Sequence, residues 1–205
     1  MIYSPTRHVL FTHVSRTGGV VLTDALQRAL PDAQRLLDQH APLAEARTVL
    51  GADRFSASFK FAIVRNPWDR LMSWYALIGK LEHNGGPAML LDPASAHWKG
   101  FDAFLEKWSA EEVRIDGVRR RKLSQWAQLA DAEGHLLIDD VGRFETLAED
   151  AARLFARMGL DRPPLPKMNT APHHHYSLYY SDFGRELVAH AFREDAERFD
   201  YRFEP

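Results

Sequence analysis

Short apolar runs bounded by polar residues predict three strands. The runs cover Val9 to Val14, Phe59 to Val64 and His135 to Asp139. The first two are rich in the β-branched and aromatic residues that favour buried strands. We therefore expect three strands well separated along the chain.

Between and after these runs, apolar residues recur at helical spacing. The spacing predicts helices over Gly19 to Leu30, Pro67 to about Gly79, about Glu145 to Gly159, and Asp182 to Arg198. Asn66 is a suitable N-cap for the second helix. Because strands alternate with helices, we expect an α/β fold with a mostly parallel central sheet flanked by helices.

Two segments interrupt the pattern. Gly79 to Gly100 carries glycines and prolines and predicts a long loop, which is a candidate lid over an acceptor. Asp161 to Pro172 holds four prolines and predicts a connection without helix. The segment after it is too short to fold alone, so residues 1–205 are expected to form one domain.

Composition excludes several classes of protein. The chain has 205 residues and no cysteine, which excludes a disulfide framework, a thiolate zinc site and a cysteine nucleophile. Its 26 Lys and Arg against 28 Asp and Glu give a net charge of −2. We therefore expect neither a nucleic-acid nor a membrane partner, and any anion site must be local.

Met1 to His8 lacks the features of a leader and no apolar run reaches the ~20 residues of a membrane span, so we expect a cytoplasmic protein. The sequence does not indicate an oligomeric state.

The first candidate site lies between the first strand and its helix, in the stretch from His13 to Gly19. Arg16, Thr17, Gly18 and Gly19 would place a guanidinium, backbone N–H groups and a helix N-terminus around one point, which suits an oxyanion. The alternative is an ordinary strand–helix turn with a surface arginine. The Walker spacing of glycines before Lys-Ser/Thr is missing, which disfavours an ordinary P-loop nucleotidase.

The second candidate site follows the second strand, from Arg65 to Ser73. Asn66, Arg70 and Ser73 share one helical stripe, and Arg65 stands at the strand end. Arg65 and Ser73 could bind one phosphate from two sides. The alternative is a capped amphipathic helix with a solvated polar face.

Taken in order, these motifs resemble those of the PAPS-dependent sulfotransferases, specifically the carbohydrate-type family. PAPS is 3′-phosphoadenosine 5′-phosphosulfate. Later landmarks occur in the same order as in that family: Arg143 to Leu147 with Asp150, the stretch ending at Asn169, Tyr179-Tyr180, and Asp195 to Phe203. The resemblance implies a single α/β domain with a core related to nucleotide kinases. It also implies a 5′-phosphosulfate bound by Arg16, Thr17, Gly18 and Gly19, and a 3′-phosphate bound by Arg65 and Ser73.

The implied reaction moves a sulfuryl group from PAPS, as co-substrate, to a hydroxyl of a carbohydrate or small alcohol, with no metal. Arg16 stands where the family has lysine, and Val20 and Val21 replace expected hydroxyl residues. Arginine can stabilise the leaving phosphate, so Arg16 is a predicted catalytic residue. The second predicted catalytic residue is His40. It is a candidate general base in a His-Ala-Pro segment similar to one in family members. His13, His83 and His97 are alternatives, and His40 could also be a surface loop residue.

Two other functions stay open at this point: a PAPS-binding protein without transfer activity, suggested by Arg16, Val20 and Val21, and a small-molecule kinase on the same fold. The acceptor, a small molecule or a glycan, is not identified by the sequence. His173 to His175 are adjacent residues with no nearby carboxylate, so they do not predict a metal site.

Overall fold

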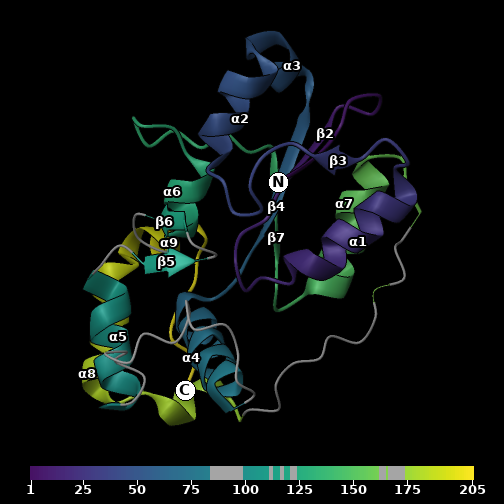
Figure 1. Ribbon diagram of the computed structural model, residues 1–205. Helices are drawn as coiled ribbons and strands as arrows, with labels where there is room; N and C mark the ends of the chain where they lie inside the picture. The colour runs from purple at the N-terminus through teal and green to yellow at the C-terminus, as the bar shows by residue number, and fades with distance from the viewer. Residues whose placement is uncertain (84–98, 111–112, 116–117, 121–123, 162–164, 166–173) are drawn as a thin grey trace. The chain divides into compact units, whose positions relative to one another are not determined.

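The computed structural model describes residues 1–83, 99–110, 113–115, 118–120, 124–161, 165 and 174–205 (Figure 1). The chain divides into two compact units, each assembled from two separate stretches of sequence. The first combines Met1–Arg65 with Gln125–Asn169, and the second combines Asn66–Ser124 with Thr170–Pro205. The expectation of one domain over residues 1–205 stays a prediction.

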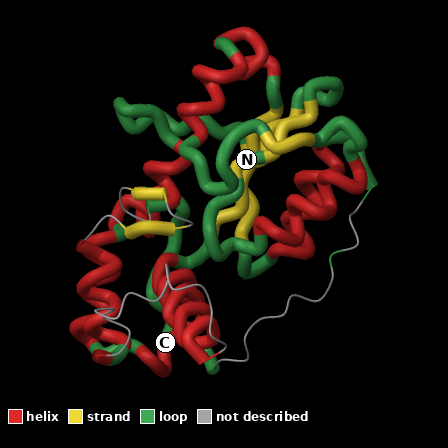
Figure 2. The backbone as a smooth tube through the Cα atoms, in the orientation of Figure 1, coloured by secondary structure: helices red, strands yellow, loops and turns green. Residues whose placement is uncertain are grey.

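A five-stranded sheet forms the centre of the first unit (Figure 2). The strands lie in the order β3-β1-β2-β4-β7. The pairs β2–β4 and β4–β7 are parallel, whereas β1 is antiparallel to both β2 and β3. The bounds are β1 Ile2–Ser4, β2 Val9–Thr12, β3 Gln34–Arg35, β4 Phe59–Val64 and β7 Asp140–Arg143.

The expected mostly parallel sheet is therefore wrong in part, because the sheet is mixed. The sequence pattern did not predict β1. Only four residues separate Ser4 from Val9, the ends of β1 and β2. A connection this short permits an antiparallel pair but not a parallel crossover, which needs a dozen or more residues.

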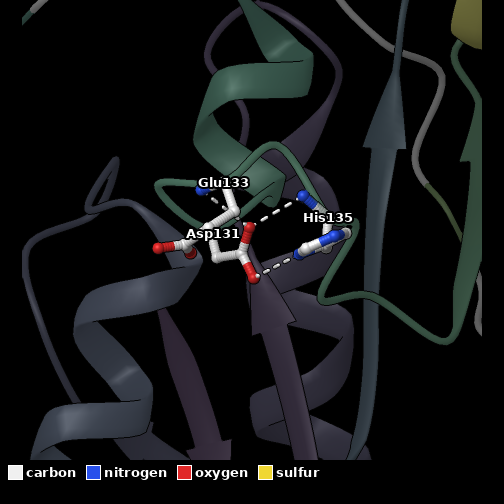
Figure 3. A group of neighbouring side chains, drawn as sticks. All are labelled: Asp131, Glu133 and His135. Atoms are coloured by element: carbon white, nitrogen blue, oxygen red, sulfur yellow. Dashed lines mark hydrogen bonds and ion pairs between the residues drawn. The ribbon is translucent and has the colours of Figure 1, made fainter.

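The strand expected over His135 to Asp139 is also wrong, since β7 begins at Asp140. Leu136 instead pairs with Ala130 in an isolated bridge. The turn between them is closed by Asp131, whose carboxylate accepts the N–H of His135 at 2.7 Å and lies 3.2 Å from His135 Nδ1 (Figure 3). β7 itself begins and ends with the charged residues Asp140 and Arg143, so the apolar pattern did not predict it.

Helices pack on both faces of this sheet. Side chains alternate along the strands, so that Phe11, Phe61 and Ile63 belong to one core cluster and Leu10 to another. The first cluster contains the apolar stripes of α1 (Gly19–Ala29) and α7 (Leu147–Arg157). The second contains residues of α2 (Leu43–Leu50) and α3 (Ala52–Ala57). The predicted β4, α1 and α7 are confirmed to within a few residues at each end, and α6 (Gln125–Leu129) completes the helices described in this unit.

The second unit is mainly helical. Its described elements are α4 (Pro67–His83), α5 (Phe101–Ala110), the hairpin of β5 (Val113–Ile115) and β6 (Val118–Arg120), the short helix η2 (Tyr176–Tyr179), α8 (Asp182–Ala191) and α9 (Arg193–Arg198). Aromatic residues dominate its core, among them Trp68, Trp74, Phe104 and Trp108.

Two sequence predictions are corrected in this unit. α4 continues past Gly79 to His83, so the start predicted for the long loop is wrong. The rest of the candidate lid, residues 84–98, lies outside the described residues, as does most of the proline-rich connection. The helix expected over Asp182 to Arg198 is interrupted at Phe192, whose backbone leaves helical geometry while its side chain joins the buried core. Within the described residues, no helix combines the length and apolar character that a membrane crossing requires.

Candidate functional site

The loop between β2 and α1 has a backbone shaped by two left-handed residues. Gly18 precedes α1 with φ of 80°, and its carbonyl accepts the N–H groups of Val21 and Leu22 at 3.1 and 3.3 Å. Arg16 has φ of 65°, which is uncommon for a residue with a side chain and occurs in tight turns as well as at binding or active sites. The Thr17 hydroxyl donates to the carbonyl of Val14 at 2.8 Å and so stabilises the loop from inside.

Gly19 is required by a neighbouring ring. A Cβ at this position would lie 1.9 Å from Cδ2 of His13 and 2.2 Å from its Nε2. No real side chain tolerates such distances, so the buried His13 ring fills the space that a side chain at residue 19 would need. The second glycine of the loop therefore lets α1 begin directly against His13.

Two arginines meet where β2 and β4 end. β2 and β4 are parallel neighbours, so the loops that follow them leave the same edge of the sheet. Arg65 directly follows β4, and its Nη1 donates to the carbonyl of Arg16 at 3.1 Å. Burial, together with the nearby charge of Arg65, lowers the pKa of Arg16 to about 10. Arg16 thus stays protonated at neutral pH, and the pair concentrates positive charge at this edge.

Two side chains hold Arg65 in position. Its guanidinium carbon lies 4.0 Å from the centre of the Phe144 ring, within the range of a cation–π contact. The amide of Gln125 accepts the Arg65 N–H at 2.9 Å and donates to the Arg65 carbonyl at 2.7 Å. Sequence analysis gave Phe144 only as part of a landmark and did not predict that Gln125 contacts Arg65. Nothing in the local pattern predicts either contact, since Gln125 lies 60 residues away.

His40 is buried, which excludes the alternative of a surface loop residue. Its Nδ1 lies 2.9 Å from the carbonyl oxygen of His13. A carbonyl can only accept, so Nδ1 carries the proton and the lone pair of the neutral ring is on Nε2. This tautomer suits a group that must accept a proton through Nε2.

His13 has the opposite arrangement. Gln39 Nε2 donates to His13 Nδ1 at 2.9 Å, which places the proton of the neutral ring on Nε2. Burial, followed by the nearby His40, lowers the pKa of His13 to about 3. The two rings meet edge to face with their centres 4.7 Å apart. His13 is therefore a neutral, buried support for His40.

Gln128 ties the His40 segment to the end of β2. Its Nε2 lies 3.1 Å from the carbonyl of His13, 3.2 Å from that of His40 and 3.5 Å from that of Ala41. Sequence analysis did not identify Gln128, and no local signal could have done so because its partners are 87 to 115 residues away.

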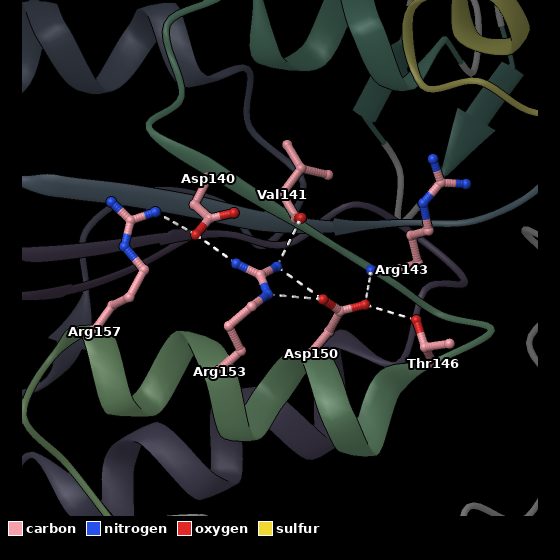
Figure 4. A network of polar contacts seen from close by, with 7 residues as sticks. All are labelled: Asp140, Val141, Arg143, Thr146, Asp150, Arg153 and Arg157. Atoms are coloured by element: carbon pink, nitrogen blue, oxygen red, sulfur yellow. Dashed lines mark hydrogen bonds and ion pairs between the residues drawn. The ribbon is translucent and has the colours of Figure 1, made fainter.

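An ion-pair network fixes the junction between β7 and α7, which carries Phe144 (Figure 4). The Asp150 carboxylate accepts the Arg143 N–H at 3.0 Å and the Thr146 hydroxyl at 2.7 Å, and it pairs with Arg153 Nη2 at 2.7 Å. Arg153 also contacts Asp140 at 2.6 Å. Partial burial alone would raise the pKa of Asp150, but these hydrogen bonds outweigh it and hold the pKa below its usual value.

The second predicted cluster runs from Arg65 to Ser73. All of its residues except Arg65 belong to the second unit. Asn66 caps α4 as predicted, accepting the Trp68 N–H at 3.1 Å, and its amide donates to the Arg202 carbonyl at 2.8 Å. Asn66, Arg70 and Ser73 are all buried, so the alternative of a solvated polar face is wrong. Arg65 belongs to the first unit, and its shared role with Ser73 stays a prediction.

The other histidines are described only in part. The side chain of His83, together with His97 and His173, lies outside the described residues, and His174 and His175 are exposed. Asp131, Glu133 and His135 bring potential metal-binding atoms within 4.8 Å of one another. The hydrogen bonds that close their turn account for this arrangement (Figure 3).

Comparison with known families assigns the chain to a family. The model described as the sulfotransferase family matches residues 1–202, so the chain belongs to the sulfotransferase family, as the order of its motifs predicted. This assignment makes the protein, in general terms, a transferase of sulfuryl groups. A search of curated proteins returned no significant match.

Proposed function

We propose that this protein transfers the sulfuryl group of PAPS to a hydroxyl of a carbohydrate or small alcohol. The observation that carries the proposal is the contact between Arg65 and the carbonyl of Arg16 at the ends of two adjacent parallel strands. An anion bound beside two like charges at one sheet edge reduces the repulsion between them. A donor with phosphate at both ends of adenosine would supply such anions.

The loop from Arg16 to Gly19 is suited to the 5′-phosphosulfate. The left-handed Gly18 precedes the N-terminus of α1, an eleven-residue helix, where backbone N–H groups and the helix dipole favour an anion. Val20 and Val21 offer no side-chain donors, so backbone N–H groups and Arg16 would bind this end of the donor. Arg16 would stabilise the negative charge that grows on the leaving phosphate oxygen.

Arg65 is the proposed partner of the 3′-phosphate. The Phe144 ring restricts its guanidinium and the Gln125 amide restricts its backbone. Both contacts lower the entropy cost of binding an anion. Ser73 is the second proposed contact, on the sequence evidence alone.

His40 is the proposed general base. The acceptor oxygen would form a bond to sulfur as the bond from sulfur to the 5′-phosphate oxygen breaks. The electron pair leaves with adenosine 3′,5′-bisphosphate, and the hydroxyl proton passes to His40 Nε2. The contact of Nδ1 with the His13 carbonyl supports this role because it fixes the tautomer that the step requires.

One experiment separates this function from its alternatives. The protein is titrated with adenosine 3′,5′-bisphosphate and with ATP, and is then incubated with radiolabelled PAPS and a panel of hydroxyl acceptors. Bisphosphate binding with label transfer supports the proposal. Binding without transfer to any acceptor indicates a PAPS-binding protein, and a preference for ATP indicates a kinase.

A further inference from the structure

The first unit contains a pocket of about 310 Å³ beside α1. Val20, Thr23 and Gln27 line it from one face of the helix, at positions i, i+3 and i+7. Arg35 and Gln39 line it from β3 and the segment that follows. The volume is at the lower end of the range for small-ligand pockets, about 300–1,000 Å³, and suits a molecule with a single ring.

The pocket is lined in part by neighbours of the proposed reaction-site residues. Val20 is the second residue of α1 and follows the last glycine of the anion loop. Gln39 directly precedes His40 in the chain. His13 lines the pocket and also contacts the His40 ring, with ring centres 4.7 Å apart. A ligand held here would therefore lie beside both the anion loop and the proposed base.

The lining combines three kinds of group. Met1, Ile2 and Val20 provide apolar surface, and Val20 is 68% exposed despite its apolar side chain. Thr23 and Gln27 provide a hydroxyl and an amide, which suit the hydroxyl groups of a ligand. Arg35 provides a cation.

The charge of Arg35 is only weakly engaged within the protein. Its Nη2 lies 3.9 Å from Asp38, with both side chains more than 60% exposed, and its Nε donates to the Leu37 carbonyl at 3.2 Å. An exposed ion pair of this length contributes little. A carboxylate in the pocket could therefore compete for the guanidinium and accept two parallel hydrogen bonds from it.

We propose that this pocket binds the acceptor, and that the acceptor is a single-ring hydroxylated acid whose carboxylate pairs with Arg35. The inference rests on the proposed function, because it takes the site beside His40 to be a sulfuryl-transfer site. The apolar side of the ring lies on Val20, and Thr23 and Gln27 bind hydroxyl groups that do not react.

The test uses two probes that share a ring and differ in charge: methyl β-D-glucuronide, which has a carboxylate, and methyl β-D-glucoside, which lacks it. Calorimetry measures the binding of each to the 205-residue protein saturated with adenosine 3′,5′-bisphosphate. The glucuronide is expected to bind more tightly. Arg35→Gln is expected to weaken glucuronide binding by roughly 10- to 150-fold, the range for a charge-assisted hydrogen bond, and to leave glucoside binding unchanged.

Two further variants complete the design. Gln27→Trp places a large ring at an exposed position of the pocket wall and should block both sugars without affecting the bisphosphate. Arg28→Gln is the matched control, because Arg28 is an exposed arginine on α1 that pairs with Asp24 and does not line the pocket. It should leave all three ligands unaffected.

The outcomes separate the inference from the function on which it rests. If the bisphosphate binds but the glucuronide does not, or if Arg35→Gln and Arg28→Gln affect glucuronide binding equally, the acceptor assignment is overturned. If Arg35→Gln or Gln27→Trp weakens bisphosphate binding instead, the pocket is part of the donor-binding site and the inference is again wrong. Failure of the unsubstituted protein to bind the bisphosphate would overturn the proposed function itself.

Discussion

His40 Nδ1 donates to the backbone carbonyl of His13, 27 residues earlier in the chain, at 2.9 Å. The hydrogen-bond acceptor is a main-chain oxygen, so the contact depends on the path of the backbone after β2 and not on the identity of residue 13. The His13 ring acts separately, by occupying the space beside Gly19 and packing against His40. The backbone thus sets the tautomer of His40, and the His13 side chain supports its ring.

Replacing His40 should reduce the rate of transfer without reducing donor affinity. We expect His40→Ala to bind adenosine 3′,5′-bisphosphate like the parent and to lose about 10²–10⁴-fold in turnover, the usual contribution of a positioned base. Steady-state turnover with PAPS and calorimetry with the bisphosphate check the two parts. His190→Ala, at an exposed position on α8, is the control. Near-parental turnover of His40→Ala would transfer the role to another histidine.

Arg65→Ala should discriminate between two donor analogues. It is expected to weaken the binding of adenosine 3′,5′-bisphosphate by about 10- to 150-fold. The binding of adenosine 5′-phosphosulfate should weaken far less, because only the bisphosphate carries a 3′-phosphate. Calorimetric titrations of both ligands measure the difference. Arg47→Ala removes an exposed arginine from α2 and should change neither affinity. Equal losses for both ligands in Arg65→Ala would contradict the assignment.

Removal of Arg16 should affect turnover more than affinity. Negative charge on the leaving oxygen grows in the transition state, so a guanidinium placed there stabilises that state most. We expect Arg16→Ala to lower turnover at saturating PAPS by a larger factor than it lowers bisphosphate affinity. Arg16→Lys keeps a cation and should retain activity. Parental turnover in Arg16→Ala would show that the loop binds something other than the transferring group.

His13 should make the fold sensitive to acid. Its pKa is about 3 in the folded protein and near its usual 6.5 in the unfolded chain. Between these values the unfolded chain binds a proton that the folded protein does not, so the free energy of unfolding falls as pH drops from about 6.5 toward 3. The slope from this residue approaches roughly 1.4 kcal/mol per pH unit.

Urea unfolding of the parent and of His13→Gln between pH 7 and pH 4 tests this expectation. The variant should show a shallower decline, since glutamine does not titrate. His190→Gln, at an exposed position, should decline like the parent. Identical slopes for the parent and His13→Gln would mean that His13 does not titrate as described.

Asp150 should contribute to stability through the acceptors that it provides. Asp150→Ala leaves the Arg143 N–H and the Thr146 hydroxyl without this partner and should lower the free energy of unfolding by roughly 1–3 kcal/mol. Glu149→Ala, one residue earlier and exposed, should stay within about 0.5 kcal/mol of the parent. Chemical denaturation measures both variants, and equal stabilities would show that the network contributes nothing.

Local patterns in the sequence were sufficient for the elements with regular periodicity. The apolar run of β4, the apolar stripes of α1 and α7, and the Asn66 cap of α4 depend on neighbours within a few residues. The order of the arginine and glycine motifs was likewise sufficient for the family, which the match over residues 1–202 confirms. β7 has charged ends and β1 has only three residues, so both carry little periodicity. The sequence pattern therefore misplaced β7 and did not predict β1, although it predicted β2.

Tertiary structure decided what surrounds the predicted site residues. The Phe144 ring reaches Arg65 only because β4 and β7 are paired, and Gln128 reaches the carbonyls of His13 and His40 from more than 85 residues away. Gly19 illustrates the difference: the sequence predicts a glycine that lets the backbone approach a ligand, whereas the fold requires that glycine because the His13 ring lies against it. Such contacts join residues with no local relationship, so no periodicity or capping signal encodes them. The sequence by itself determined which chemical groups the site contains, and the packing of the strands and loops determined their tautomers, charge environment and supports.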